Sequence, residues 1–404
     1  MNKLPSDWQI KTINEVCNIY TGNSINKKKK EENFIGLKEG LNYIGTKDIS
    51  FNNIIEYENG VKIPFKDLKD FKIAKSNTSL LCIEGGSAGR KIGFTNQDVC
   101  FGNKLCCFEA IEDEPKFIYF YLQSNDFLRE FNSNIQGLIG GVNKENLRKI
   151  KIPIPPLDEQ KRIASALSKI DAYLENTIKL IEEKERFKRG IAKKLLTCKE
   201  GENIPEARFK GFEDEWMEVA ISKIGTIITG NTPSTKNESF WNGNNVWVTP
   251  TDIKQKYISN SERKLTDDGL KKSRKLPANT LLITCIASIG KNAILKCEGA
   301  CNQQINAIIP NKNYNVDFLY YLFENEKSYL KFKAPQSVIK IMSKSEFSKL
   351  VFKFPLLEEQ EKIGGYLSLL DAEIDNLKKQ KELIKEMKRG AMQKLLSGEV
   401  RLLE

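Results

Sequence analysis

Apolar residues recur at alternating steps of four and three in two stretches of the chain. The first stretch contains Ile163, Leu167, Ile170, Leu174, Thr177 and Ile181, and the pattern resumes at Ile191 and Leu195. The second contains Ile363, Leu367, Leu370, Ile374 and Leu377, followed by Ile384 and Leu395. A spacing of about 3.5 residues keeps one narrow apolar seam on one side of a helix, so the pattern predicts two long helices of the coiled-coil type.

The borders of these helices are marked by proline and glycine. Pro155 and Pro355 predict the starts, because proline suits the first helical turn or the residues before it. Gly190 and Gly390 are expected to interrupt each helix near its end. The matching seams favour pairing of the two helices with each other, in an antiparallel arrangement that is the easiest to connect. Two separate surface helices are the alternative.

The two stretches are copies of one segment. Residues 155–196 and 355–396 align without a gap and are identical at 18 of 42 positions. They share Pro-x-Leu-x-Glu-Gln at the start, Asp-Ala in the middle, and Lys-Arg-Gly and Lys-Leu-Leu near the end. Thr21-Gly22-Asn23 also corresponds to Thr229-Gly230-Asn231, although at an offset of 208 instead of 200. A common frame with individual loops predicts two similar domains with different ligands.

The repeat predicts four segments. They are a first globular domain at 1–156, a long helix at 157–199, a second globular domain at 200–356 and a second long helix at 357–404. We expect α/β (α+β) domains with mixed sheets, separated by the antiparallel helices in a pseudo-two-fold arrangement. The predicted strands include Tyr43–Ile44, Leu80–Ile83 and Leu281–Ile283, and the predicted amphipathic helices are Phe117–Phe131 and Phe318–Phe332.

Composition indicates a polyanion as the partner. The chain has 404 residues and a formal net charge of +11, which leaves room for two domains of roughly 150 residues each. Residues 201–356 carry 22 basic and 16 acidic side chains. Basic globular domains suit nucleic acid. The basic run Lys27–Lys30 is by itself more often a solvated loop than a binding site.

Catalytic and metal chemistry are not indicated. The chain has no histidine and nine scattered cysteines, which we interpret as reduced cytoplasmic thiols without a metal site. Gly85–Lys91 looks like a phosphate-binding loop, but its spacing is one residue short and Arg90 stands where the lysine should be. No stretch approaches the ~18 apolar residues of a membrane span, and no signal peptide is apparent. We therefore expect a binding protein with no catalytic residues.

The repeated Pro-x-Leu-x-Glu-Gln start, the Lys-Arg-Gly helix and the Lys-Leu-Leu end resemble the specificity subunit of type I restriction–modification systems. The linker Ile204–Phe212, followed by Glu215-Trp216, resembles the opening of a recognition domain in that family. The first domain departs from this pattern, because Leu4-Pro5-Ser6-Asp7-Trp8 lacks the Arg-Phe-x-Gly-Phe lead. The resemblance covers the whole chain.

The resemblance implies a non-catalytic DNA-binding subunit. Each of two target recognition domains would read one half of a split site in double-stranded DNA. The long helices would bind two modification (methyltransferase) subunits, which carry S-adenosylmethionine. A restriction (motor nuclease) subunit that uses ATP and Mg²⁺ can join such an assembly. The chain itself would hold no cofactor and would contact no membrane.

Polar and basic loop residues are the candidates for DNA contacts, because side-chain donors and acceptors read base edges while basic groups hold phosphates. In the first domain they are Asn23, Ser24, Lys27, Lys28, Lys47, Ser87, Arg90, Lys91, Asn103 and Lys104. In the second domain they are Asn231, Thr232, Ser234, Thr249, Thr251, Lys254, Ser288, Lys291, Gln303 and Gln304. Arg90 is the candidate for a guanine contact, and Gln303 and Gln304 suit adenine. Each of these side chains can instead cap a loop.

The candidates for partner binding on the helices lie in both copies. They are Leu167, Leu174, Lys188 and Arg189 in the first copy, and Leu367, Ile374, Lys388 and Arg389 in the second. Two other classes of function remain open. One is a structural coiled-coil adaptor with two protein-binding globular ends, which predicts no salt-sensitive DNA binding. The other is an enzyme that acts alone on DNA, which the missing histidines and the absence of methyltransferase motifs disfavour.

Overall fold

The structure is a computed structural model, and it describes residues 4–136, 140–334 and 341–403. The chain divides into two compact units. The first unit combines residues 1–178 with residues 380–404, and the second unit is residues 179–379. The first unit is therefore built from both ends of the chain, whereas the second is one continuous segment.

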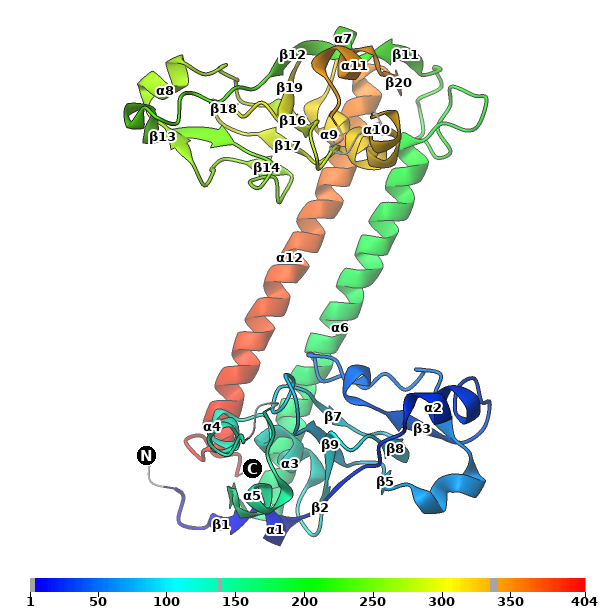
Figure 1. Ribbon diagram of the computed structural model, residues 1–404, viewed down its shortest axis with the longest axis vertical. Coiled ribbons are helices and arrows are strands. Elements are labelled where there is room, and N and C mark those ends of the chain that lie inside the picture. The colour runs from blue at the N-terminus through cyan, green and yellow to red at the C-terminus, as the bar shows by residue number, and fades with distance from the viewer. Residues whose placement is uncertain (1–3, 137–139, 335–340, 404) are drawn as a thin grey trace. The chain divides into compact units, whose positions relative to one another are not determined.

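In its described residues the first unit contains two four-stranded sheets and a two-stranded ribbon (Figure 1). An antiparallel sheet has the order β2 (Cys17–Thr21), β9 (Leu105–Ala110), β6 (Ser79–Cys82), β7 (Ile92–Phe94). A mixed sheet has the order β4 (Lys62–Ile63), β3 (Leu41–Ile44), β8 (Val99–Phe101), β5 (Ile73–Ala74), with β3 parallel to β8. The ribbon pairs β1 (Gln9–Thr12) with β10 (Lys151–Ile154). The helices before the first long helix are α1 (Ile13–Val16), α2 (Lys27–Asn33), α3 (Pro115–Tyr121), α4 (Asn125–Ser133) and α5 (Lys144–Lys149), with 3₁₀ turns η1 (Thr46–Asp48) and η2 (Phe65–Asp70).

The second unit repeats this strand pairing. One sheet has the order β12 (Gly225–Thr229), β19 (Ile305–Pro310), β16 (Thr280–Thr284), β17 (Asn292–Leu295), β14 (Tyr257–Ile258). A second sheet has the order β15 (Lys264–Leu265), β13 (Trp241–Val248), β18 (Gly299–Cys301), with β13 parallel to β18. The ribbon pairs β11 (Met217–Ala220) with β20 (Val351–Phe354). The short helices are α7 (Ile221–Ile224), α8 (Asp267–Lys271), α9 (Val316–Asn325), α10 (Lys327–Lys333) and α11 (Lys344–Lys349), with the 3₁₀ turn η3 (Glu238–Phe240).

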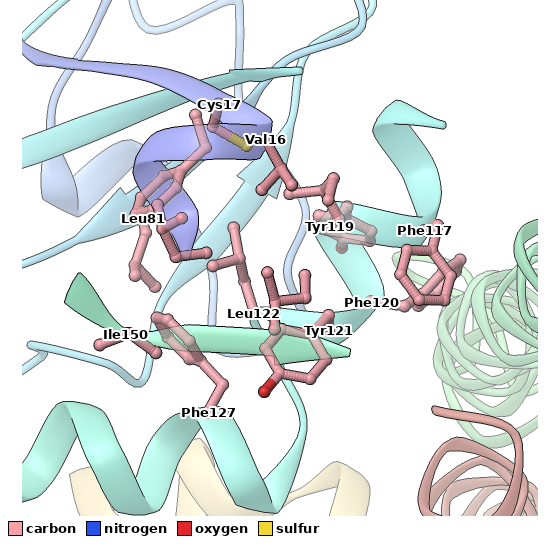
Figure 2. Close-up of a cluster of buried hydrophobic side chains, with 14 of the residues drawn as sticks. Val16, Cys17, Leu81, Phe117, Tyr119, Phe120, Tyr121, Leu122, Phe127 and Ile150 are labelled. Carbon is pink, nitrogen blue, oxygen red and sulfur yellow. The ribbon is translucent and has the colours of Figure 1, made fainter. Parts of the chain in front are cut away.

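The sheet that contains β9 and the sheet that contains β19 are each buried on both faces, because the side chains of their strands alternate between two cores. In β9, Cys106 and Phe108 face one cluster, whereas Leu105 and Cys107 face the other. The adjacent thiols of Cys106 and Cys107 thus lie on opposite faces of one strand, and burial raises the pKa of the Cys107 thiol to about 11. The first of these cores is rich in aromatic side chains of α3 and α4, such as Tyr121 and Phe127 (Figure 2).

The two long helices are α6 (Leu157–Leu196) and α12 (Leu357–Leu396). Each starts two residues after its marker proline, and the predicted starts are confirmed. The expected interruptions at Gly190 and Gly390 are wrong, since both residues lie inside continuous helix. A glycine costs a helix only about 1 kcal/mol relative to alanine, which the surrounding helix formers outweigh. Across the described residues, no helix is long and apolar enough to cross a membrane.

In each unit the two long helices pack side by side and antiparallel, as predicted (Figure 1). In the first unit, Ile163 and Leu167 of α6 share a core with Leu395 and Leu396 of α12. In the second unit, the end of α6 meets the start of α12 in the equivalent core. The lysine of each Lys-Arg-Gly motif pairs with the aspartate of the Asp-Ala motif on the other helix. Lys388 binds Asp171 at 2.6 Å in the first unit, and Lys188 binds Asp371 in the second.

The repeated Glu-Gln at the start of each long helix joins that helix to its globular domain. Gln160 accepts a hydrogen bond from the backbone of Glu114 and donates one to the Pro155 carbonyl, each at 2.9 Å. Gln360 makes the same pair of contacts with Asn315 and Pro355, at 3.0 and 2.9 Å. The position just before α3 therefore corresponds to the position just before α9.

The Glu of the motif binds a tryptophan and an arginine in both units. Glu359 accepts hydrogen bonds from the Trp216 indole and from Nε and Nη2 of the Arg208 guanidinium. Glu159 accepts from the Trp8 indole at 3.1 Å and from Arg401 at 2.7 and 2.8 Å. The first domain lacks the Arg-Phe-x-Gly-Phe sequence before its tryptophan. The arginine that it lacks is replaced by Arg401, from the C-terminal segment of the chain.

The predicted strands are confirmed, although Ile83 lies one residue beyond the end of β6. The two predicted long amphipathic helices are partly wrong. Phe117–Phe131 contains two helices, α3 and α4, because the Ser124 side chain caps the second by accepting from the Phe127 backbone. Phe318–Phe332 is likewise divided between α9 and α10. The apolar pattern continues across each break, since both helices of a pair pack on the same core.

Candidate nucleic-acid interface

Four loops at the ends of strands lie together in each unit, and they hold most of the predicted DNA-binding residues. We call them the strand-end loops. In the first unit they are Gly22–Ser24 after β2, Gly45–Asp48 after β3, Ile83–Lys91 between β6 and β7, and Gly102–Lys104 between β8 and β9. In the second unit they are Gly230–Ser234 after β12, Thr249–Asp252 after β13, Cys285–Lys291 between β16 and β17, and Asn302–Gln304 between β18 and β19.

Equivalent backbone hydrogen bonds hold these loops together in both units. In the first unit the bonds run from Asn23 to Phe101 and from Gly102 to Ile44, each at 2.9 Å. In the second they run from Asn231 to Cys301 and from Asn302 to Val248, also at 2.9 Å. Because backbone groups make these bonds, the side chains can differ between the units without changing the frame.

The glycine of the shared Thr-Gly-Asn motif is required by close packing. A Cβ atom on Gly22 would lie 1.9 Å from the Phe101 carbonyl oxygen. On Gly230 it would lie 2.2 Å from the carbonyl oxygens of Cys301 and Asn302. Both glycines let the chain pass directly over the end of the neighbouring strand.

The asparagine of the motif braces a neighbouring loop in each unit. The Asn23 side-chain oxygen accepts from the Lys72 backbone at 2.6 Å, and that of Asn231 accepts from the Arg274 backbone at 2.7 Å. The Tyr43 hydroxyl and the Trp247 indole donate to the backbone oxygens of the same two asparagines. Burial raises the pKa of Tyr43 to about 12, so it stays a neutral donor. Asn23 and Asn231 therefore shape the loops from within.

Several other candidates are exposed on the strand-end loops. In the first unit these are Ser24, Lys47, Arg90, Asn103 and Lys104, and in the second unit Ser234, Thr251, Lys291 and Gln303. Lys254, just beyond the second-unit loops, is exposed as well. The remaining loop candidates, Ser87, Lys91, Thr232, Thr249, Ser288 and Gln304, are half-buried. The exposed set is the part of the prediction that a ligand can reach without rearrangement.

Some candidates hold their own loops. Lys91 donates to the Thr46 carbonyl at 2.9 Å, and the Thr249 hydroxyl donates to Asp252 at 2.7 Å. Gln303 accepts from Thr232, and Gln304 accepts from Asn302 at 3.0 Å. The Arg90 guanidinium lies 5.1 Å from the centre of the exposed Phe51 ring.

The basic run Lys27–Lys30 forms most of helix α2, with Asn26 as its N-cap. Lys27 and Lys28 stand 3.9 Å from Glu31 and Glu32 one turn later. The side chains of these two lysines and two glutamates are exposed, and exposed pairs of this kind contribute only ~0.3–0.5 kcal/mol. A polyanion can therefore displace the glutamates, but the run is less positive than its sequence suggests.

The hairpin loop between β6 and β7 in the first unit differs in length from the equivalent loop between β16 and β17 in the second unit. Nine residues, Ile83–Lys91, connect β6 to β7, whereas seven residues, Cys285–Lys291, connect β16 to β17. In the second loop Ala287 has a φ of 60°. This left-handed conformation is energetically unfavourable for a residue that has a Cβ atom. Ser87 and Ser288 thus lie in loops of different shape on a common frame.

The predicted partner-binding residues fall into three environments. Leu167, Leu367 and Ile374 are buried, and Leu174 is half-buried. Lys188 and Lys388 pair with Asp371 and Asp171. Arg189 and Arg389 are exposed. Several large apolar side chains of the long helices do not belong to the apolar seam and are exposed. They are Tyr173, Leu383 and Met387 in the first unit, and Leu180, Phe187 and Leu369 in the second.

Three features of the structure were missed from the sequence. Arg263 stacks on the Trp241 ring at 3.8 Å, beside Trp247. Lys256 is enclosed by tyrosines. Arg401 completes the joint at Glu159. Among residues 4–136, 140–334 and 341–403, no group of three acidic or cysteine side chains could hold a metal ion.

Comparison with known proteins agrees with this arrangement. The family model of the type I restriction modification DNA specificity domain matches residues 5–183 and 213–386. The MjaIX specificity subunit of Methanocaldococcus jannaschii is 36% identical over 180 residues, which are 43% of this chain and only 42% of that protein. The MjaVIII specificity subunit of the same organism is 26% identical over 428 aligned positions, covering 99% of this chain and 94% of the relative.

The fold has also been solved before. The crystal structure of the type I restriction–modification S subunit from M. genitalium superposes with a TM-score of 0.61 at 17% identity, covering 98% of this chain and 97% of that one. The family model covers most of the chain as two copies, and each copy begins in a globular domain and ends in a long helix. The chain therefore belongs to the type I restriction–modification DNA specificity family, whose role is the recognition of DNA.

Proposed function

We propose that this chain is a non-catalytic specificity subunit that reads a two-part site in double-stranded DNA. Residues 1–156 and 200–356 are the two target recognition domains in this proposal, and each reads one half-site. The observation that carries the proposal is the pair of strand-end loop clusters. They share a backbone frame but present different exposed side chains, as expected for two readers of different sequences.

The exposed loop residues carry the contacts in this proposal. Arg90 is suited to guanine through two donors on its fork, and Gln303 is suited to adenine through its amide. The phosphates are bound by exposed lysines, which are Lys47, Lys104, Lys254 and Lys291. Asn23 and Asn231 act indirectly by bracing the loops.

The long helices, at 157–199 and 357–404 in the domain scheme, dock two modification subunits in this proposal. Those subunits bring S-adenosylmethionine, and restriction subunits with ATP and Mg²⁺ join when the system has them. Support comes from the exposed apolar side chains on the helices, such as Phe187 at 53% and Leu383 at 63% exposure. Leu383 and Met387 are both exposed and lie four residues apart on α12, so they are neighbours on one face of the helix. Adjacent exposed apolar side chains of this kind are typical of a docking surface.

The direct test is the salt dependence of DNA binding. A protein that neutralises phosphates releases counterions, so the association constant should fall steeply with salt. We expect the chain, with its modification subunits, to lose roughly a hundredfold or more in affinity for a target duplex between about 50 and 200 mM salt. Substituting Lys104 and Lys291 by Met should make that slope shallower by about one unit each.

The adaptor alternative predicts a different result. A coiled-coil adaptor with protein-binding ends would show no salt-sensitive binding to DNA and no preference for one duplex sequence. An affinity that does not change with salt, or equal affinity for all duplexes, would reject the proposed DNA-reading role.

A further inference from the structure

Lys256, which directly precedes β14, has a side chain that is enclosed by polar and aromatic groups. Only 9% of it is exposed. Its ammonium group donates to Asp317 at 2.6 Å, to the Ser368 hydroxyl at 2.7 Å and to the Tyr321 hydroxyl at 3.1 Å. A lysine has three N–H donors, so each has a partner. The position of Lys256 is therefore defined from three directions.

Three tyrosine rings surround the same ammonium group. Its distance to the ring centre is 4.3 Å for Tyr321, 4.8 Å for Tyr257 and 5.3 Å for Tyr320. Cation–π contacts at such distances are worth more when the cation is shielded from water. Burial lowers the pKa of Lys256, although the hydrogen bond to Asp317 acts in the opposite direction.

The contacts continue from Lys256 to both long helices within the second unit. Ser368 belongs to α12, and the Tyr321 hydroxyl donates to Asp371 on the same helix. Asp371 in turn pairs with Lys188 of α6. The Lys188 ammonium group lies 5.3 Å from the centre of the Tyr321 ring. One polar network thus joins the segment before β14 to both helices.

That segment also contains predicted DNA-binding residues. Thr249, Thr251 and Lys254 lie two to seven residues before Lys256. The first half of the segment is held by Asp252, which accepts from the Thr249 backbone at 2.8 Å and the Glu262 backbone at 2.9 Å. Lys256 anchors the other end. We call residues 249–257 the anchored loop.

The first unit has the same link made by different residues. Asn53 donates to Gln123 at 2.8 Å, Lys388 donates to Gln123 at 3.2 Å, and Lys388 pairs with Asp171. Phe120 occupies the position of Tyr321, since the starts of α3 and α9 correspond. A cavity of about 670 Å³ is lined by these side chains, including Asn53, Gln123 and Asp171. The link between loop and helices is thus repeated, and it is denser in the second unit.

We propose that Lys256 is a positioning residue, which fixes the anchored loop to the helix pair and so sets where the second half-site lies relative to a modification subunit docked on those helices. This inference rests on the proposed function. The physical reason is that methyl transfer requires the reacting atoms to be aligned within a fraction of an ångström. A loop that binds DNA while free to shift on the helices would keep its sequence preference and lose that alignment.

The test uses the full chain in complex with its modification subunits. Lys256→Met removes the charge and keeps most of the side-chain volume. Tyr321→Phe removes only the hydroxyl, and it introduces the residue that the first unit itself carries at this position. Lys344→Met, on the exposed surface of α11, is the matched control. The measurements are DNA affinity, the initial methylation rate at each half-site, and hydrogen exchange of residues 249–257.

We expect Lys256→Met to slow methylation at the second half-site roughly tenfold or more. The rate at the first half-site should not change, and affinity for the cognate duplex should fall no more than about threefold. Exchange of the anchored loop should become about fivefold faster. Tyr321→Phe should give the same pattern with a smaller effect, and Lys344→Met should behave as the wild type.

If both variants methylate both half-sites at the wild-type rate while they still bind the cognate duplex, the positioning role is overturned. An equal loss at both half-sites would overturn it as well, because that pattern indicates a general loss of folding or binding. Failure of the wild-type complex to bind a two-part site is a different result, and it would count against the proposed function itself.

Discussion

Arg401 does in the first unit what Arg208 does in the second. Arg208 binds Glu359 through Nε and Nη2, and Nη2 also donates to the Asp214 backbone carbonyl. Arg401 binds Glu159 with two nitrogens and Asp7 with two. Both glutamates are buried next to a tryptophan. The lead that is absent before Trp8 is therefore replaced by a residue from the other end of the chain.

Replacing Arg401 by Met should destabilise the first unit by about 3 kcal/mol, because it leaves the buried Glu159 carboxylate without its cation. Hydrogen exchange of residues 105–122, read by mass spectrometry, should increase. Residues 305–322 report on the second unit and should not change. The matched variant Arg208→Met should reverse this pattern, and any effect of Arg401→Met confined to residues 305–322 would contradict the assignment.

The close approach at Gly22 leads to a second prediction at this scale. Gly22→Ala places a methyl group 1.9 Å from the Phe101 oxygen, and overpacking of this kind costs about 1–3 kcal/mol or more. Gly86, on a neighbouring loop, has no atom within 4 Å of its Cβ position, so Gly86→Ala should change stability by less than about 0.5 kcal/mol. Urea denaturation of both variants checks this, and equal midpoints would refute the packing argument.

At the scale of elements, the long helices present different residues to the core and to the outside. Leu167 is fully buried in the first-unit core, together with Leu395. Leu383 and Met387 of α12 are 63% and 50% exposed. A partner docked on the first unit would therefore contact Leu383 and Met387, whereas Leu167 holds the two helices together.

The double substitution Leu383→Glu and Met387→Glu should keep the melting temperature and reduce co-purification of the modification subunit about tenfold. Glu386→Gln, on the exposed side of the same helix, is the control. Leu167→Asp should instead unfold the first unit, since it buries a charge. Undiminished recovery of the complex from the double variant would show that the partner docks elsewhere.

The long helices were predictable because their apolar period extends over forty residues and marker prolines precede both starts. Their glycines were misjudged, since propensity at one position is weaker than the cooperativity of a long helix. The break between α3 and α4 was missed because the aromatic pattern runs through Ser124. The break is made by the Ser124 cap on the Phe127 backbone and by the tighter backbone hydrogen bonds of Gln123 and Ser124 to Phe120 and Tyr121.

The candidate site was predictable by residue type and only partly by role. Asn23 and Asn231 lie in the expected loops, but they brace backbone 49 and 43 residues away. The environment of Lys256 was not predictable either, because Tyr321 and Ser368 are 65 and 112 residues distant in sequence. Contacts at that range follow from the fold and leave no local signal.

At the scale of the whole molecule, the repeat predicts modular specificity. Exchanging residues 1–156 for the first domain of another family member should change one half of the methylated motif and leave the other half intact. The reason is that the strand-end loops of each unit are held by contacts within that unit. Methylome sequencing of cells that carry the exchange reads both halves at once, and a change in both halves would refute modularity.

Such an exchange should retain Arg401 and its partners. Because Arg401 binds Asp7 and Glu159, the incoming domain needs an acidic residue before its first tryptophan. A donor domain without one is the matched control. It should fold less stably without a change in the second half-site.

The division of the first unit between both ends of the chain affects how the protein is made. A ribosome finishes the second unit, residues 179–379, before it reaches the last segment of the first. At about 5–20 residues per second, the 218 residues from Lys179 to Leu396 take roughly 11–44 s to synthesise. Throughout that time Ile163 and Leu167 lack Met392, Leu395 and Leu396, with which they share a core. The first unit is therefore completed only after the second has been synthesised, and we expect its nascent form to expose these apolar side chains to chaperones and proteases during that interval.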